Sequence, residues 1–424
     1  MIQRIKIWHL LLLILLIILV LRFDRIMDIA VLLINYLKLL LGDSDTSPVR
    51  LNSQLIDHFI SLILLIVIPS VIILNKKKLK YLLLPAGLSV SVFAIIMTLF
   101  LFAPVISTTN PDLQFTLSEA KLLPPLSSKE FVLINSDKLN LGDKKFLSDE
   151  KLIMGNLFEN EFVIGESIEI KSDSIYVYQN GGIKVFPVSI AGANTTEPLI
   201  HRQVFLLGSD EYGRDIFSRL VYGTRLSILI GFCSVLLSLL IGVLLGFTAG
   251  YYGTFINTVL NRFADMFLSF PVIFLIILII AFLGSSLLTI IFVLGLAGWT
   301  AIFKIVRSEI ASLKQKDFII ASKNLGLPDL KILTREMLPL MISPIIVSVV
   351  FQFANVIIAE AALSYLGLGL GAVYPSWGAM IHQGQSYLSQ AWWISLFPCL
   401  FLFVTLLTVN FLGRNLEQKI NPQL

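Results

Sequence analysis

Long apolar runs separated by short polar stretches dominate this chain. A run near or above 20 residues is long enough to cross about 30 Å of hydrocarbon, and the sequence contains Leu82–Ala103, Leu226–Gly250, Met266–Phe303, Met337–Ala359 and Trp392–Leu412. The shorter runs are Ile7–Leu21 and Phe59–Leu74. Because Met266–Phe303 has twice the necessary length, we expect a hairpin bent near Gly284–Ser286. The pattern predicts an all-α polytopic membrane protein with eight spans.

The composition agrees with a membrane protein. Apolar residues make up 56% of the chain and charged residues 14%, against roughly 25% charged residues in soluble domains. The N-terminus has the basic start and apolar core of a secretory signal, but no small-x-small cleavage site follows the core. We therefore expect a retained membrane anchor. Cys233 and Cys399 both lie in apolar runs and supply neither a disulfide framework nor a metal-binding pattern.

The placement of charge predicts the orientation of the spans. Lysine and arginine in short loops favour the cytoplasmic side. Two stretches are rich in them: Asn75–Lys80 (NKKKLK), and Lys304–Glu336 with seven basic against four acidic residues. Alternating spans place both stretches inside, together with a loop at Tyr251–Asp265. The same alternation places residues 105–205 and Gly367–Trp392 outside.

The outer segment 105–205 carries a β-strand pattern. Apolar residues alternate with period two in Glu161–Ile190, around Ile168/Ile170 and Ile175/Val177. The letters QNGG, typical of a tight hairpin turn, follow that alternation. We expect a small β-rich external domain, which is either a docking surface or a decorated loop.

One polar stretch, ASKNLGLPDLKILTREMLP at residues 321–339, has a helical pattern. Apolar residues at helical spacing are Leu330, Leu333, Met337, Leu340 and Met341, with a looser set upstream at Ile310, Leu313, Ala321 and Leu325. Between these sets, Gly326 suits a left-handed residue after a helix end and Pro328 suits a first helical turn. We expect a cytoplasmic helix–turn–helix whose first helix continues one span and whose second leads into the next. It is either an amphipathic connector on the bilayer surface or a docking element.

Chemical motifs are missing from the sequence. It contains no G-x-x-x-x-G-K-[ST] phosphate loop, no H-E-x-x-H and no G-x-S-x-G, and its four histidines are scattered. We therefore predict no catalytic residues and no metal site. Any energy used for transport must come from a separate subunit.

The polar stretch resembles the EAA loop of the permeases of binding-protein-dependent ABC transporters. In that loop, E-A-A-x-x-x-G is followed by proline thirteen residues after the glycine. The matching positions here are Ala321, Gly326, Leu338 and Pro339. Ile320 stands where the family has Glu, and Ser322 stands where it has its second Ala.

Three further blocks are similar to one branch of that family, the dipeptide/oligopeptide permeases of the C-subunit type. Leu207–Gly231 resembles the G-T-D-x-x-G-R-D signature, and Gly250–Gly253 (GYYG) resembles the segment after the second core helix. Ala359–Ile381 resembles the E-A-x-L-S-F-L-G-L-G…P-S-W-G block. The four blocks cover about residues 200–415 in the family order.

The resemblance implies a type I ABC importer permease core of five spans plus a preceding span. The implied domains are an extra N-terminal transmembrane region (1–80), the first family helix (81–104), the external insertion (105–205) and the permease core (206–424) with an EAA-type coupling loop at 308–339. The chain would sit in the bacterial inner membrane as a multi-pass protein.

The implied function is the channel subunit of an ABC importer for di- or oligopeptides. Its partners would be a second homologous permease, two ATP-binding subunits that hold ATP and Mg, and an external peptide-binding protein, with no cofactor and no enzymatic activity in this chain. The residues implied in coupling to the ATPases are Ala321, Ser322, Gly326, Lys331, Arg335, Leu338 and Pro339. Other cargo, such as nickel chelates, stays open.

Several other residues have two interpretations each. Glu360, near the outer end of a span, would line the peptide route or make an interhelical hydrogen bond. Arg214 and Asp215 would sit near the external gate and meet the binding protein, or form a turn and helix cap with an exposed ion pair. Gly242, Gly246 and Gly250 recur every fourth residue and predict close helix packing, at the subunit interface or in the core bundle.

Two rival classes remain at this point. A stand-alone secondary transporter would need mid-membrane carboxylates and an internal repeat. Glu360 is the one carboxylate deep in the spans of the second half, and no clear repeat is visible. An intramembrane enzyme would need paired Asp residues, a His cluster or a nucleophile–base spacing within the spans, and the sequence has none of these.

Overall fold

The computed structural model describes residues 6–24, 26–27, 29–30, 53–75, 87–115, 117–135, 160–171, 173–179, 181–188 and 200–420. These form two compact units, each built from separate stretches of the chain. The first comprises Met1–Val105, Thr224–Ala379 and Leu400–Leu424, and the second comprises Ile106–Gly223 and Met380–Cys399. Residues 76–80 of the basic Asn75–Lys80 stretch, 82–86 of the expected span at Leu82–Ala103, and 136–159 and 189–199 of the expected insertion lie outside the described residues.

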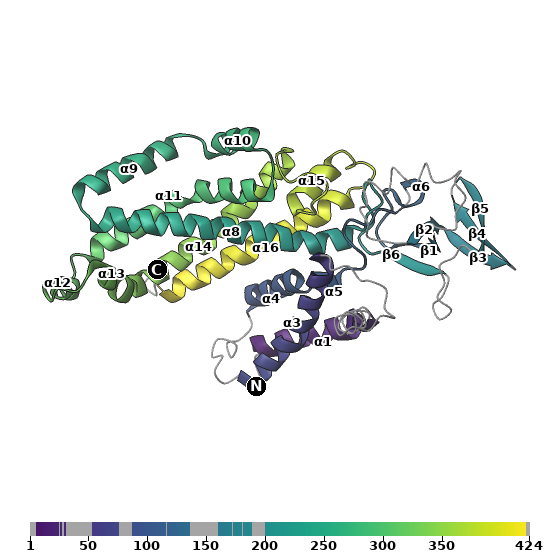
Figure 1. Ribbon diagram of the computed structural model, residues 1–424, viewed down its shortest axis with the longest axis horizontal. Helices are drawn as coiled ribbons and strands as arrows, with labels where there is room; N and C mark the ends of the chain where they lie inside the picture. The colour runs from purple at the N-terminus through teal and green to yellow at the C-terminus, as the bar shows by residue number, and fades with distance from the viewer. Residues whose placement is uncertain are drawn as a thin grey trace, which may run out of the picture. The chain divides into compact units, whose positions relative to one another are not determined.

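Helices make up most of the described chain (Figure 1). Before the strands they are α1 (Ile7–Leu21), α3 (Ser53–Asn75), α4 (Leu88–Leu101), α5 (Ala103–Ile106) and α6 (Leu117–Ala120). After the strands they are α8 (Ile216–Tyr251), α9 (Thr254–Ser269), α10 (Val272–Leu283), α11 (Leu287–Leu313), α12 (Asp317–Asn324), α13 (Asp329–Ile332), the π-helix η4 (Leu333–Met337), α14 (Leu338–Tyr365), α15 (Trp377–Gln385) and α16 (Trp393–Ile420).

The apolar helices largely match the expected spans. By length and hydropathy, four described helical stretches can cross a membrane: Ile216–Tyr251, Leu287–Leu313, Asp329–Tyr365 and Trp393–Gln418. The pair α9 and α10, bent by 84°, makes up to a fifth span, and three shorter apolar helices lie in the N-terminal region. The bend expected near Gly284–Ser286 is confirmed, because α10 ends at Leu283 and α11 starts at Leu287.

The segment expected as a cytoplasmic loop, Tyr251–Asp265, is helical from Thr254, because α9 occupies Thr254–Ser269. Its polar residues, which suggested a loop, instead contact α11. Asn257 accepts a hydrogen bond from Arg307 Nη1 at 2.8 Å, and Asp265 pairs with Lys304 at 3.1 Å. These contacts join α9 to α11, through partners about 40 to 50 residues away in the sequence.

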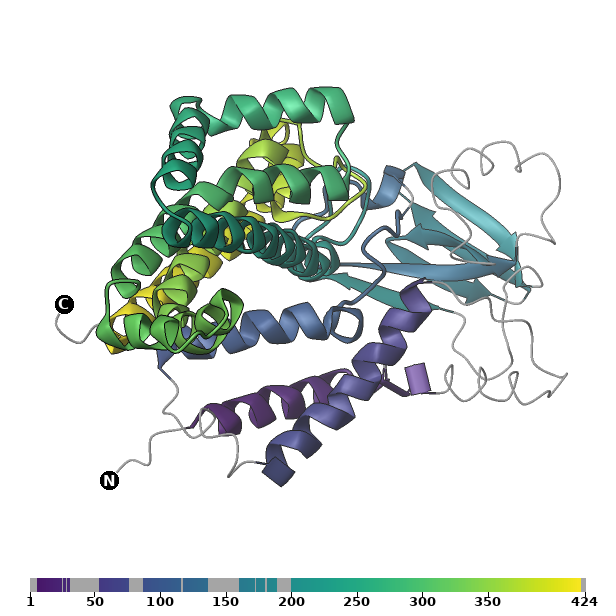
Figure 2. The same ribbon diagram turned by 60° about the vertical axis from the view of Figure 1, so that its left-hand side comes forward.

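Close packing of α8 against α11 organises the first unit. A Cβ added to Gly242 would lie 2.7 Å from Ile302 Cβ, and one added to Gly250 would lie 2.9 Å from the Arg307 carbonyl oxygen. Every fourth position of α8 thus approaches the α11 backbone, and the Ser238 hydroxyl donates a 2.6 Å hydrogen bond to the Gly295 carbonyl. The glycine repeat therefore belongs to the bundle of this chain. In Figures 1 and 2, α8, α11 and α14 run alongside one another.

The N-terminal helices also belong to the first unit. Helix α1 packs against α3 and α4, as the purple and blue ribbons of Figure 2 show. Asp57 of α3 forms a two-pronged ion pair with Arg225 of α8, with Nη2 2.7 Å from Oδ1. This pair joins α3 to α8 within the first unit.

The second unit contains the β-structure. Its strands are β1 (Ser127–Asn135), β2 (Asn160–Gly165), β3 (Ser167–Lys171), β4 (Ser174–Gln179), β5 (Gly182–Pro187) and β6 (His201–Phe205). They form two antiparallel three-stranded sheets, in the orders β2-β1-β6 and β3-β4-β5. Val132, Ile168, Ile175 and Val177 form an apolar core that joins the two sheets.

The strand pattern read from the sequence is confirmed within the described residues. Ile168 pairs with Val177, and Ile170 pairs with Ile175, in the β3–β4 register. Gln179 lies opposite Gly182, which places a tight turn where the letters QNGG predict one. Ile170 is exposed, however, whereas Ile168, Ile175 and Val177 are buried. The alternating pattern therefore identified the strands more reliably than it identified the buried face.

Candidate functional site

The 308–339 loop joins α11 to α14 through two short helices. Helix α12 is followed by a break around Gly326, and the chain is then continuously helical from Asp329 to Tyr365. The expected helix–turn–helix, with its second arm leading into the next span, is confirmed. The first arm is not continuous with α11, contrary to expectation. Lys316 has an extended backbone (ψ 139°), which interrupts the helical hydrogen bonds between the two helices.

Gly326 forms the corner between the two arms. Its φ of +77° is left-handed, which side-chain-bearing residues adopt at a cost of roughly 1–2 kcal/mol. The Leu327 N–H donates to the Ser322 carbonyl oxygen at 3.2 Å, a bond typical of a helix C-terminus that ends at glycine. Pro328 lies immediately before α13 and not within its first turn, because its own extended backbone (ψ 144°) caps that helix.

The buried face of the loop differs from the predicted stripe. Ile332, Met337 and Met341 are fully buried, whereas Leu330 is 70% exposed and Leu340 is 53% exposed. The π-helix η4 explains the difference, because its wider turn adds one residue between Ile332 and Met337. A regular α-helical repeat therefore does not match the buried positions in this part of the loop.

The upstream arm shows a similar difference. Ile310 is buried as predicted, but Leu325 is 82% exposed, and Ile319 is the buried residue of α12. Ile319, Ile332 and Met337 share an apolar cluster with residues of α8 and α11. The loop is therefore packed on the bundle along one side.

The opposite side of the loop is apolar and exposed. Its large exposed residues are Phe318, Ile320, Leu325 and Leu330. Ile320 is the residue in place of the family Glu, and its side chain is 46% exposed. An exposed apolar set of this kind, on a loop otherwise rich in charge, is typical of a protein-binding surface.

The other residues predicted on this loop fall into two groups. Ala321, Lys331, Arg335 and Pro339 are exposed, and Leu338 is partly buried. Ser322, partly buried, donates a hydrogen bond to Glu336 Oε1 at 2.8 Å. Ser322 therefore ties the two arms together, while Lys331 and Arg335 add positive charge to the exposed surface.

Tyr251 is a residue of this site that the sequence did not reveal. It is the last residue of α8, it is 5% exposed, and its hydroxyl donates a hydrogen bond to Asp329 Oδ1 at the start of α13. Lys314 donates to the Tyr251 carbonyl oxygen at 2.7 Å. The sequence offered one signal, an aromatic residue at the end of a span that precedes a cationic loop. This pattern is too common to identify a contact.

Glu360 lies on α14 and is 1% exposed. The Ser364 hydroxyl donates a 2.9 Å hydrogen bond to its Oε1. Ser364 is on the same helix, but the Ser376 side chain, immediately before α15, is also hydrogen bonded to the Glu360 carboxylate. Glu360 therefore links α14 to the start of the next helix, as the hydrogen-bond interpretation predicts. Its neighbourhood is tightly packed, since a Cβ at Gly378 would lie 2.7 Å from Ser364 Cβ.

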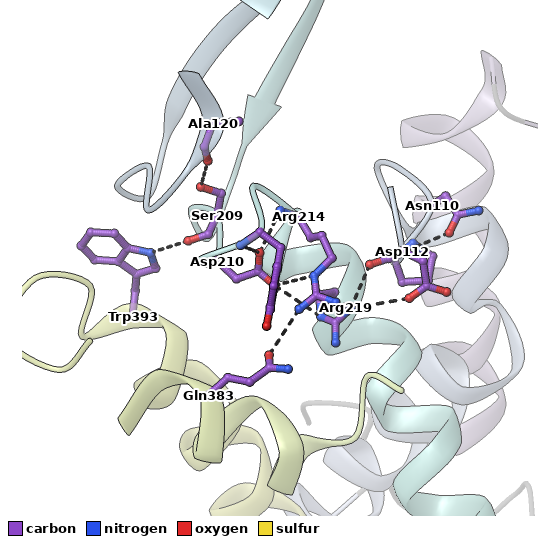
Figure 3. Close-up of polar contacts among 11 residues, drawn as sticks. Asn110, Asp112, Ala120, Ser209, Asp210, Arg214, Arg219, Gln383 and Trp393 are labelled. Carbon is purple, nitrogen blue, oxygen red and sulfur yellow. Dashed lines mark hydrogen bonds and ion pairs between the residues drawn. The ribbon is translucent and has the colours of Figure 1, made fainter. Parts of the chain in front are cut away.

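Arg214 lies in a buried cluster of charged residues in the second unit (Figure 3). It is 3% exposed, and its Nε donates to Asp210 Oδ2 at 2.7 Å. Its Nη2 lies 3.5 Å from Gln383 Oε1. Arg219 lies 3.8 Å from the same Asp210 carboxylate and 3.6 Å from Asp112. The exposed ion pair expected here is therefore wrong: the pair is buried and joins Arg214 to Asp210.

Asp215 caps α8 at its first residues. Its Oδ2 accepts hydrogen bonds from the Ser218 N–H at 2.9 Å and from the hydroxyls of Ser218 and Thr108. The predicted helix cap is confirmed, although Asp215 is fully buried. Burial raises the pKa of the Asp215 carboxyl, against the opposing effect of these hydrogen bonds.

The Trp393 indole N–H donates to the Ser209 carbonyl oxygen at 3.3 Å, so residues from α16 join the same unit (Figure 3).

Metal-binding geometry is absent from the part of the chain that the structure describes, where no group of three or more His, Cys, Asp or Glu side chains comes together.

Comparison with known proteins identifies the family. Residues 242–422 match the family described as "binding-protein-dependent transport system inner membrane component". The chain is 34% identical over 220 residues to the di/tripeptide transport system permease protein DppC of Pseudomonas aeruginosa, covering 52% of this chain and 73% of that protein. It belongs to the binding-protein-dependent ABC permeases, in the DppC-like branch.

Other relatives and structures add detail. The permease is 36% identical to the dipeptide transport system permease DppC of Bacillus subtilis, covering 51% of this chain and 68% of that protein. It is 37% identical to the glutathione transport system permease GsiD of Pectobacterium atrosepticum, covering 51% of this chain and 72% of that protein. Among solved structures, it is similar to the inward-facing MetNI methionine ABC transporter, at a TM-score of 0.39 and 18% identity, covering 49% of this chain and 96% of that one.

Family membership confirms several expectations together. The permease is a multi-pass component of the bacterial inner membrane, it is a channel subunit of an importer, and it works with other ABC components. The helical fold class with a permease core is likewise confirmed.

Proposed function

We propose that this permease is a channel subunit of an importer for di- or oligopeptides. The observation that carries the cargo assignment is its 34–38% identity to permeases named for dipeptide, di/tripeptide, peptide or glutathione transport, matched over about half of this chain and most of theirs. The partners are a second homologous permease, two ATP-binding subunits that hold ATP and Mg, and an external peptide-binding protein. This chain itself contributes no ATPase activity and no cofactor.

The 308–339 loop would be the surface that receives force from one ATP-binding subunit. Its exposed apolar residues and its cations Lys331 and Arg335 supply a binding face, and its buried face is packed on α8 and α11. Closure of two ATPases is a rigid-body motion, and a loop packed into the bundle transmits displacement better than an unsupported one. This role requires the loop to lie in the cytoplasm, as its basic residues predict.

The same orientation assigns the remaining parts. Residues 105–205 would form an external insertion and residues 1–80 an extra membrane region ahead of the first family helix at 81–104. Arg214 and Asp215, at the start of α8, and Glu360, near the end of α14, would then lie toward the outer side. Arg214 and Asp215 would support the external gate from buried positions in the second unit, and Glu360 would line the peptide route from α14.

Co-purification followed by activity measurements tests the proposal. The tagged permease should copurify with a second permease and an ATPase carrying a phosphate loop. ATP hydrolysis by the complex in proteoliposomes should rise when a binding protein loaded with a dipeptide mixture is added. Stimulation by a nickel chelate and not by peptides would refute the cargo. Transport by the permease alone, without ATPase subunits, would refute the importer role.

A further inference from the structure

Tyr251 contacts both arms of the 308–339 loop from the end of α8. Its hydroxyl is hydrogen bonded to Asp329, in the first turn of the second arm. Its ring lies 5.9 Å from the Nζ of Lys323, in the last turn of the first arm, and 5.5 Å from the Nζ of Lys314. A cation over an aromatic face at this distance is attracted by the ring electrons. A single side chain therefore makes polar contacts on each side of Gly326.

These contacts go beyond filling space. The Tyr251 ring stacks on Phe247 one turn earlier, at 5.3 Å and 21°, and it belongs to the apolar cluster that the loop packs against. A phenylalanine would preserve that packing. The hydroxyl adds a hydrogen bond to a carboxylate, which is stronger than a bond between neutral groups, and that bond fixes the position of α13.

Within the loop the Ser322–Glu336 hydrogen bond joins the two arms, but the corner at Gly326 is not packed against other residues that the structure describes. A Cβ added at Gly326 would meet no atom within 4 Å, and the first arm is separated from α11 by the extended Lys316. A force on the loop is thus passed stiffly to α14, which is continuous with the second arm, but only weakly along the chain to α11. Helix α8 has no covalent continuity with the loop, so its link depends on side-chain contacts.

We propose that Tyr251 is a positioning residue for energy coupling, which fixes both arms of the 308–339 loop to α8 so that the helix moves when the loop moves. This inference rests on the proposed function for its role in transport, whereas the mechanical link between loop and α8 can be tested without any cargo.

The first experiment measures the link directly. Nitroxide labels are placed at Asn324→Cys in the first arm and at Leu244→Cys on α8, two exposed positions outside the apolar surface of the loop, after the native Cys233 and Cys399 are replaced by serine. Pulsed electron resonance on the assembled complex should give one narrow distance distribution. Tyr251→Phe should broaden it, and Asp329→Ala should broaden it to the same extent. Tyr252→Phe is the matched control, since this neighbouring tyrosine is 53% exposed.

The second experiment measures coupling in the same complex. Tyr251→Phe should retain the ATPase subunits on co-purification and keep the unstimulated rate of ATP hydrolysis. Stimulation by dipeptide-loaded binding protein should fall about tenfold. A decrease of this size is expected when a hydrogen bond to a charged group is lost from one of two conformational states of the complex. Asp329→Asn, which keeps an oxygen acceptor for the hydroxyl, should restore part of the stimulation lost in Asp329→Ala. The double variant Tyr251→Phe/Asp329→Ala should be no worse than either single variant.

The outcomes distinguish a failure of the inference about Tyr251 from a failure of the proposed cargo. An unchanged distance distribution in Tyr251→Phe overturns the inference, whatever the cargo is. Loss of the ATPase subunits from Tyr251→Phe also overturns it, because the residue would then serve assembly. A wild-type complex without peptide stimulation refutes the proposed cargo, while the distance measurement still decides the role of Tyr251.

Discussion

Replacing Gly246 with alanine should destabilise the permease, because α11 leaves no room for a methyl group at that point. A Cβ at Gly246 would lie 2.8 Å from Val306 Cβ and 3.0 Å from the Phe303 carbonyl oxygen. Carbon atoms in contact normally stay about 3.5–4.0 Å apart. Neither neighbour can rotate away, since one is a Cβ and the other is backbone. The two helices would therefore have to separate.

Gly231 offers a matched control on the same helix. A Cβ there would also lie 2.8 Å from its nearest neighbour, but that neighbour is Cε2 at the edge of the Phe353 ring, which can turn. Overpacking costs about 1–3 kcal/mol, and the better helix propensity of alanine offsets about 1 kcal/mol in both variants. Because the propensity gain cancels between them, Gly246→Ala should be about 1–2 kcal/mol less stable than Gly231→Ala.

Denaturant titration in mixed micelles measures this difference. Unfolding of the purified permease is followed by tryptophan fluorescence as the fraction of sodium dodecyl sulfate rises, with size-exclusion chromatography to confirm a monodisperse starting state. Trp299, buried beside α8 and α9, reports on the affected region. Equal stability of the two variants, or a Gly246→Ala variant as stable as wild type, would refute the packing argument.

Three further predictions concern charged residues. Lys331→Glu with Arg335→Glu should lower peptide-stimulated ATP hydrolysis several-fold in proteoliposomes while membrane insertion is unchanged; normal stimulation would count against the loop as the ATPase contact. Arg225→Ala should cost about 1 kcal/mol of stability, because the Asp57 pair is only partly buried, and the swap Asp57→Arg/Arg225→Asp should restore part of it in the same titration. Burial raises the pKa of Asp215 above its usual 3.8, so the folded state binds the proton more tightly than the unfolded state does. The free energy of unfolding should therefore fall as the pH rises from 3.8 through the raised pKa. Asp215→Asn, which keeps the cap, should flatten this pH dependence of the melting temperature, and an unchanged pH dependence would contradict the argument.

Much of the helical architecture was predictable because it depends on local patterns. A run of 20 apolar residues has few alternatives to a membrane helix. The bend after Leu283 and the corner at Gly326 follow from glycine, which adopts left-handed φ angles without the clash of a Cβ. The β4–β5 hairpin likewise follows from two alternating segments that flank a tight turn.

The candidate site was predictable in position but not in its supports. The motif at residues 321–339 located the loop, and the structure adds that its cations Lys331 and Arg335 are exposed. The partner of Tyr251 was not visible, because Asp329 lies 78 residues further along the chain. The π-helix η4 also escaped detection, since a change of helical period appears only when the buried residues are known.

The sequence alone shows which segments are apolar enough for a membrane, where glycines allow the chain to turn, and which family the second half resembles. These properties depend on composition and on short-range spacing. The contacts of α9 with Lys304 and Arg307, and the pairing of Arg214 with Asp210 inside the second unit, depend on how distant segments of the chain pack. The same holds for the pairing of Asp57 with Arg225. The physical reason is that a charged group in a poorly hydrated environment must find an opposite charge or a hydrogen bond, and the available partner depends on how distant segments pack.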